Sequence, residues 1–188
     1  MRVYSIIIWN LEKKVQLSEL VNLEDFNFWE KSIALNIIRK ISQLTIEVTE
    51  PGKQISILHE GYLCHVLNRN NGLACAIITD QEYPSRVSFD IIIYYSDQYY
   101  KEYGLNFPSE PFLYDYIIEI QNPKDIDKLT KIKNDIDNTK EIVLETIEQL
   151  ISRGEKLENL NNKSNKLVDD AKKFQTQSQE LNACCNIL

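Results

Sequence analysis

The C-terminal third of the chain carries a heptad pattern, which constrains the fold more than any other feature of the sequence. Alternate steps of three and four residues run from Leu129 to Leu181, a span of more than seven heptads. A repeat of this length is typical of one helix of a coiled coil. The apolar positions along the predicted seam are Leu129, Ile132, Ile136, Val143, Leu150, Leu157, Leu160, Leu167, Ala171, Phe174 and Leu181.

A helix of this length cannot pack along one small domain, since it would be roughly 80 Å long at about 1.5 Å per residue. Seam positions such as Thr139, Thr146 and Ser164 bury little apolar surface, so an isolated copy gains little from folding. We therefore expect the coiled-coil segment, residues 122–183, to fold when it binds partner helices.

Arg153 occupies a seam position between Leu150 and Leu157. A buried guanidinium costs several kcal/mol unless its donors are satisfied. Partners with side-chain amides at the same level would satisfy it only in one alignment, so the residue would fix the register. A bundle of identical chains would gather several arginines at one level, which favours association with different chains. The alternative is a tolerated polar layer that only weakens a homodimer.

The first 121 residues show another pattern, which predicts an α+β domain. Short runs rich in β-branched and aromatic residues predict strands, and longer segments predict helices. The predicted strands are 2–9, 15–20, 55–61, 62–69 and 73–79, and the predicted helices are 26–44, 86–104 and 111–121. This order predicts a five-stranded antiparallel sheet with helices on both faces. Phe26, Trp29, Ile33, Ile37 and Ile41 give the first helix one apolar face.

Asn71 and Gly72 predict a two-residue type I′ hairpin turn between the last two strands. This register would place Asn68 opposite Cys75, and Cys64 near Thr79, so the two thiols would not face each other. His65 lies beside Cys64, but an intracellular structural zinc site needs four convergent ligands. We therefore favour core packing over a metal site for His65 and both thiols.

The chain ends in Cys184-Cys185-Asn186-Ile187-Leu188. The last four residues fit a C-terminal prenylation box with the prenyl group on Cys185, and Leu188 favours geranylgeranyl. One lipid gives only marginal membrane binding, so a palmitoyl or other second lipid on Cys184 would complete the anchor. The alternative is an incidental pair of terminal thiols. We assign residues 184–188 to this lipidation tail.

Composition excludes several classes of protein. The formal net charge of −7 argues against binding to nucleic acid. No apolar run approaches the about 20 residues of a membrane-spanning helix, and the start of the chain lacks a signal-peptide pattern. Four cysteines at these positions do not form a disulfide framework, which indicates a reducing compartment. No catalytic motif is present, so we expect a non-enzymatic protein without a cofactor.

Three stretches carry a family resemblance. ISRGEKLENL around Arg153, together with Phe174, resembles an R-SNARE motif, whereas YLCHVLNRN (62–70) and DQEYPSRVSF (80–89) resemble an N-terminal longin domain. With the terminal cysteine pair, the whole chain is similar to the Ykt-type family of longin-domain R-SNAREs, which lipid rather than a transmembrane helix anchors.

The resemblance implies a profilin-like longin domain at 1–121 and an R-SNARE segment at 122–183. Arg153 would then meet three glutamines from Q-SNARE proteins in a parallel four-helix bundle. Zippering from Leu129 toward Leu181 would draw two membranes together for docking and fusion of intracellular vesicles. The resemblance also implies the cytosol and the cytoplasmic faces of Golgi, ER and endosomal vesicle membranes as the location. Members of the family usually end in residues that favour farnesyl, so farnesyl and geranylgeranyl both remain open for Cys185.

In this family the longin domain folds back on the SNARE segment and shelters the lipid in an apolar groove beside the first helix. The resemblance makes Phe26, Phe28, Trp29, Ile33 and Ile37 candidates for that autoinhibitory groove, and packing in the core is the alternative for each. A different function for the whole chain also remains open. It would be a longin-type trafficking adaptor that binds small GTPases or coat proteins and uses its coiled coil for assembly.

Overall fold

The structure is a computed structural model that describes residues 1–109, 112–113, 115–124, 126 and 143–146. In chain order its elements are β1 (Val3–Asn10), β2 (Val15–Val21), α1 (Phe28–Val48), β3 (Gln54–His59), β4 (Tyr62–Asn68), β5 (Leu73–Asp80), α2 (Ser85–Tyr103), α3 (Tyr116–Glu119) and β6 (Val143–Thr146). Each of the five predicted strands is present, and the two long helices lie where the sequence predicts them.

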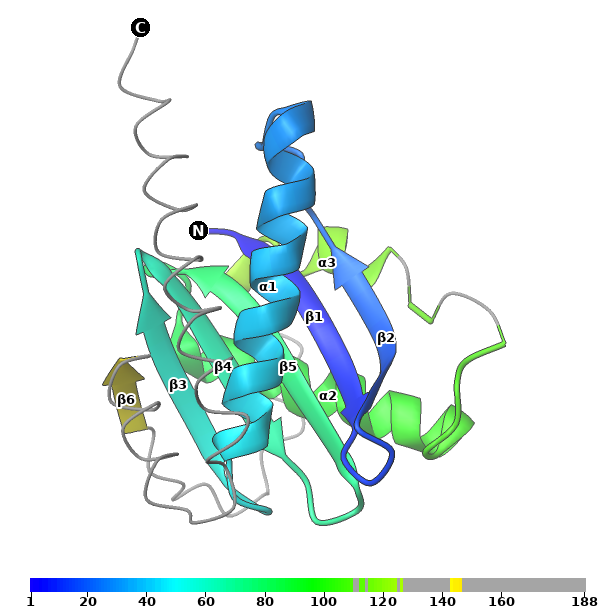
Figure 1. The fold of residues 1–188 in the computed structure, drawn as a ribbon. Coiled ribbons are helices and arrows are strands. Elements are labelled where there is room, and N and C mark those ends of the chain that lie inside the picture. The colour runs from blue at the N-terminus through cyan, green and yellow to red at the C-terminus, as the bar shows by residue number, and fades with distance from the viewer. Residues whose placement is uncertain (110–111, 114, 125, 127–142, 147–188) are drawn as a thin grey trace, which may run out of the picture.

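The strands form one sheet in the order β2-β1-β5-β4-β3-β6. Strands β1 to β5 pair antiparallel, which confirms the predicted five-stranded antiparallel sheet. Helix α1 covers one face of this sheet and α2 covers the other (Figure 1). The domain is therefore α+β with a helix on each face, as the sequence predicts.

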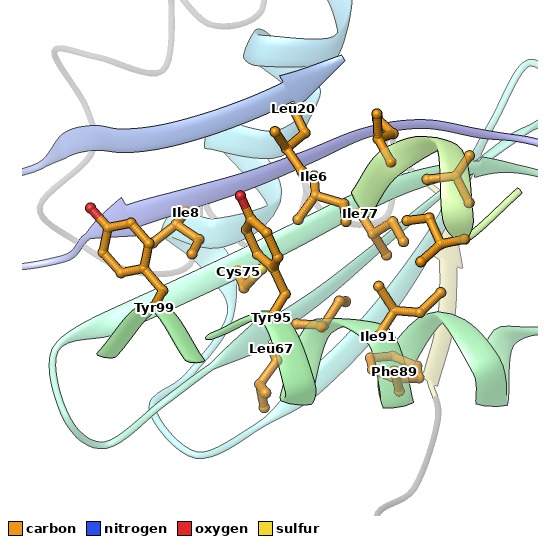
Figure 2. Close-up of a cluster of buried hydrophobic side chains, with 14 of the residues drawn as sticks. Ile6, Ile8, Leu20, Leu67, Cys75, Ile77, Phe89, Ile91, Tyr95 and Tyr99 are labelled. Atoms are coloured by element: carbon orange, nitrogen blue, oxygen red, sulfur yellow. The ribbon is translucent and has the colours of Figure 1, made fainter. Parts of the chain in front are cut away.

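Each face of the sheet has its own hydrophobic core. Along β1, Ile6 and Ile8 point toward α2, whereas Ile7 between them packs toward α1. Figure 2 shows the α2 side, where Ile6, Ile8 and Cys75 of the strands meet Tyr95 of the helix. Because successive residues of a strand face opposite sides, a continuous apolar run such as β1 marks a strand that is covered on both faces.

The buried face of α1 differs from the predicted apolar row. Its buried residues are Ala34, Ile38, Ile41, Ser42, Thr45 and Ile46, so only Ile41 of the predicted face belongs to them. Apolar residues fill two neighbouring rows of this helix, and periodicity alone does not choose between them. The small side chains Ala34 and Ser42 let the helix approach the sheet closely, which selects the row that contains them.

The turn between β4 and β5 is also different from the prediction. Asn68 lies opposite Ala74, not Cys75, and Cys64 lies opposite Ile78. Arg69 N–H donates to the carbonyl of Leu73 at 2.8 Å, closing a three-residue loop over 70–72. Of these three residues only Gly72 has positive φ, 86°, whereas a type I′ turn needs two such residues. The inference that the thiols do not face each other nevertheless holds.

Two further segments depart from the predicted helices. Within 111–121 the described helix is only α3, four residues long. At 143–146 the seam residue Val143 belongs to strand β6 instead of a helix. Without β6, strand β3 would pair only with β4, and its other edge would have unpaired backbone groups; β6 satisfies them. That pairing competes with the coiled-coil conformation of the same residues.

Candidate functional site

The first part of the candidate site is the pairing of β6 with β3. The two strands run parallel, with Ile55 opposite Val143, Ser56 opposite Leu144, Ile57 opposite Glu145 and Leu58 opposite Thr146. Strand β6 comes from the predicted coiled-coil segment and extends the sheet of the N-terminal domain as its sixth strand (Figure 1). The site therefore joins the two predicted parts of the chain by backbone hydrogen bonding.

The predicted groove residues lie in the N-terminal half of α1, except for Phe26, which precedes the helix, and none of them is a buried core residue. Phe28 and Trp29 are 79% and 81% exposed, and their rings meet edge-to-face with centroids 5.4 Å apart. An Asn27–Glu30 capping box starts the helix at this point, which sets where the two rings project. The alternative of core packing is thus wrong for both residues.

Phe26, Ile33 and Ile37 are half-buried. Ile37 packs against the α1-side core from its margin, so it is a boundary residue and not a core residue. Phe26 lies in another aromatic group, because its ring contacts Tyr4 edge-to-face at 6.0 Å, and Tyr4 in turn contacts Tyr62 at 5.3 Å. Sequence reasoning missed Tyr4 and Tyr62, although both are aromatic residues at the start of a predicted strand.

An ion pair shows which flank of α1 faces β2. Arg39 donates through Nε to Glu19 of β2 at 2.9 Å and through a second nitrogen at 2.5 Å. Ile37 precedes Arg39 by two residues, about 200° around the helix. The Arg39 flank faces β2, so Ile37 is on the flank toward β3. Strand β6 is added beyond β3 (Figure 1), so the flank of α1 that carries Ile37 lies toward the side of the sheet where β6 pairs.

The possible metal ligands are not brought together. Cys64 is buried on the α1 side of the sheet and Cys75 on the α2 side. Burial raises the pKa of the Cys64 thiol to about 12 and also raises that of Cys75, so both remain protonated. Among the described residues no group of three or more metal-binding side chains occurs. The core interpretation of the two thiols agrees with their burial.

Several predicted site residues lie outside the described part of the chain. These are Arg153, the tail residues Cys184 and Cys185, and every predicted seam residue except Val143 and Thr146. Among the helices of the described residues, none is long and apolar enough to cross a membrane.

Comparison with known proteins covers both parts of the chain. Residues 23–119 match the longin family model, described as a regulated-SNARE-like domain, and residues 128–186 match the synaptobrevin family model. The chain is 32% identical to the synaptobrevin homolog YKT6 of Debaryomyces hansenii and 31% identical to that of Saccharomyces cerevisiae, each over the full length of both chains. It is also 32% identical to the VAMP-like protein YKT61 of Arabidopsis thaliana, over 93% of this chain and 91% of the relative.

Proposed function

This chain belongs to the YKT6 family of synaptobrevin homologues with a longin domain, and on that premise we propose that its longin domain holds its own SNARE segment inactive. The chain is a non-enzymatic R-SNARE of vesicle fusion, and its SNARE motif implies Q-SNARE partners. The proposal adds the regulation of that activity and the means of membrane attachment. It divides the chain into 1–121, 122–183 and 184–188.

The observation that carries the proposal is the β6–β3 pairing. Strand β6 lies inside the region that matches the synaptobrevin family, and its backbone is bonded to the longin sheet. A residue cannot be in a strand of this sheet and in a helix of a four-helix bundle at once. Pairing with β3 therefore withholds Val143 to Thr146, in the N-terminal third of the seam, from Q-SNARE partners.

The second part of the proposal is lipid anchoring. A prenyl group on Cys185 and a second lipid on Cys184 would attach the chain reversibly to the cytoplasmic face of Golgi, ER and endosomal vesicle membranes. In the cytosolic form the lipid would lie against α1. The half-buried flank of Ile33 and Ile37 and the exposed rings of Phe28 and Trp29 support this placement, since apolar surface of this kind needs a cover. Phe26 would border it.

The third part concerns the released state. Arg153 would lie among three glutamines of the Q-SNARE partners, and the seam residues from Leu129 to Leu181 would form the layers on either side. Burial of the seam on coupled folding supplies the free energy for membrane approach. Release of β6 from β3 would precede formation of the layer that contains Val143.

A reversible tether tests the regulation. In a Cys184→Ser, Cys185→Ser background, the pair Leu58→Cys and Thr146→Cys joins two residues that face each other across β3 and β6. Neighbouring strands lie about 4.8 Å apart, within the range of Cα separations that a disulfide spans. The oxidised chain should fail to form a heterotetramer with Q-SNARE helices, and reduction should restore assembly.

The matched control is Leu58→Cys alone in the same background, which should assemble under both conditions. Cys64 and Cys75 are buried and do not compete for the tether. Assembly of the oxidised double variant at the rate of the reduced one would contradict the proposed regulation. Failure of even the reduced chain to bind Q-SNARE helices would instead favour the trafficking-adaptor function.

A further inference from the structure

The segment that follows α2, from Gly104 to Ile126, leads to the SNARE segment and is called the connector. Gln121 fastens it to the rest of the longin domain. Its Oε1 accepts from the Val3 N–H at 3.0 Å, and its Nε2 donates to the Val3 carbonyl at 2.9 Å and to the Ile117 carbonyl at 2.7 Å. A carboxamide offers the same donor and acceptor as a peptide group. The pairing of β1 with β2 begins only at Ser5 opposite Val21, so Gln121 takes the place of a neighbouring strand at Val3.

Buried apolar side chains fasten the connector on both sides of Gln121. Ile120 is fully buried and Ile126 is 6% exposed, and both belong to the core on the α2 side of the sheet. The hydroxyl of Tyr83 donates to the carbonyl of Ile120 at 2.5 Å. Pro123 between them is buried as well. The domain core thus continues past position 121.

Two tyrosines of α2 hold the earlier part of the connector. The hydroxyl of Tyr95 donates to the carbonyl of Phe112 at 3.3 Å, and that of Tyr99 donates to the carbonyl of Asn106 at 2.7 Å. The ring of Phe112 also packs against both tyrosine rings, with centroids 5.1 and 5.3 Å away. Backbone carbonyls of a surface connector are thereby satisfied by buried hydroxyl groups, a costly arrangement to undo.

We propose that the connector as far as Ile126 stays on the longin domain when the SNARE segment is released, and so forms the fixed point from which the bundle is pulled. This inference rests on the proposed function. Strand β6 is a four-residue strand at a sheet edge, whereas the connector buries isoleucines in the core and binds both polar groups of Val3. Release therefore removes β6 and leaves the connector in place.

The fixed point limits how far the longin domain can move from the assembled bundle. The first seam residue, Leu129, follows Ile126 by three residues, which span at most about 10 Å when extended. The domain would remain beside the N-terminal end of the four-helix bundle after full zippering. Any partner that binds this end of the bundle would then also meet the longin domain.

Amide hydrogen exchange in the full chain, alone and assembled with Q-SNARE helices, tests the inference. The Val3 amide reports the Gln121 contact directly, because its hydrogen-bond acceptor is the Gln121 side chain. We expect the Val3 and Ile120 amides to keep their protection on assembly, while the β3 amides that pair with β6 lose theirs. Loss of Val3 and Ile120 protection together with release of β6 would overturn the inference and leave the proposed function intact.

Retention of β6 on β3 in the assembled complex would overturn the proposed function, and the inference with it. Two variants check that exchange of the Val3 amide reports the Gln121 contact. Gln121→Ala should raise the exchange rate of the Val3 amide in the free chain about tenfold, whereas Lys124→Ala, an exposed neighbour, should leave it unchanged. Equal Val3 exchange in Gln121→Ala and the parent chain would show that the carboxamide does not fasten the connector.

Discussion

Ser56 of β3 and His65 of β4 lie opposite each other in the sheet and share a hydrogen bond of 2.7 Å between the serine Oγ and the imidazole Nδ1. The imidazole is fully buried, its Nε2 has no hydrogen-bond partner, and Phe89 of α2 packs edge-to-face against it at 5.3 Å. Burial lowers the pKa of His65 from 6.5 to about 4. The folded protein therefore holds this histidine neutral.

The first prediction is a loss of stability in acid that depends on His65. Because its pKa is lower in the folded chain than in the unfolded chain, the unfolded chain takes up the proton first as the pH falls. The free energy of unfolding keeps its full value above about pH 6.5. It falls progressively toward pH 4, by about 2–3 kcal/mol at most. Urea unfolding between pH 4 and 8 measures it. His65→Gln should flatten this part of the profile, and His59→Gln should not.

The second prediction concerns the β3–β4 turn. His59 pairs with Tyr62, and the two residues between them, Glu60 and Gly61, have positive φ of 46° and 90°. This is the two-residue turn that favours Asn-Gly, because glutamate is strained at positive φ. Glu60→Asn should stabilise the domain by about 0.5–1 kcal/mol, measured by urea unfolding. Glu60→Ala removes the charge but keeps the strain, so an equal gain in that variant would attribute the effect to charge.

The sequence predicts the longin sheet well because its strands have a strong local signal. Apolar runs such as β1 and β5 are buried on both faces, and few other local structures suit so many β-branched residues. The loop over 70–72 escapes prediction because an Asn-Gly pair serves both two- and three-residue hairpins. Only the backbone register distinguishes them, and here Gly72 alone takes positive φ.

Strand β6 could not be predicted from local sequence. Val143 and Thr146 fit the heptad seam, yet their β-branched side chains also suit a strand, and the free edge of β3 decides between the two in this conformation. The residues predicted for the lipid groove beside α1 could not be located from sequence either. Helical spacing identifies the apolar residues of a helix but not which of them touch the sheet. The residues of β6 thus carry both patterns in one sequence, a heptad seam and a strand.

The third prediction separates the exposed and buried residues of α1. Trp29→Ala should change the free energy of unfolding by less than about 0.5 kcal/mol, because the side chain is 81% exposed. Ile38→Ala should cost about 2–4 kcal/mol, because Ile38 lies in the core. If Trp29 covers the lipid, the lipidated Trp29→Ala chain should shift from cytosol to membranes in cell fractionation. No shift would remove Trp29 from the lipid-binding surface.

The fourth prediction concerns the tail cysteines. Cys184→Ser should leave weak, reversible membrane binding, since one lipid provides only marginal affinity. Cys185→Ser removes the proposed prenylation site and should abolish stable binding, as should the double variant. Membrane flotation measures the binding, and the intact mass of the cellular protein identifies the lipids. A double variant that still floats with membranes would contradict lipid anchoring through these residues.

The fifth prediction tests the seam arginine. In an assembled bundle, Arg153→Leu would leave glutamine side chains of the partners buried without their donor. Each unsatisfied group costs about 1–3 kcal/mol, so the heterotetramer should melt at a lower temperature and tolerate shifted registers. Lys166→Leu is the matched control, because the heptad count places Lys166 on the outer face of the helix. Equal melting of both variants would show that Arg153 is only a tolerated polar layer, since a guanidinium that satisfies three carboxamides cannot be replaced by an apolar side chain without cost.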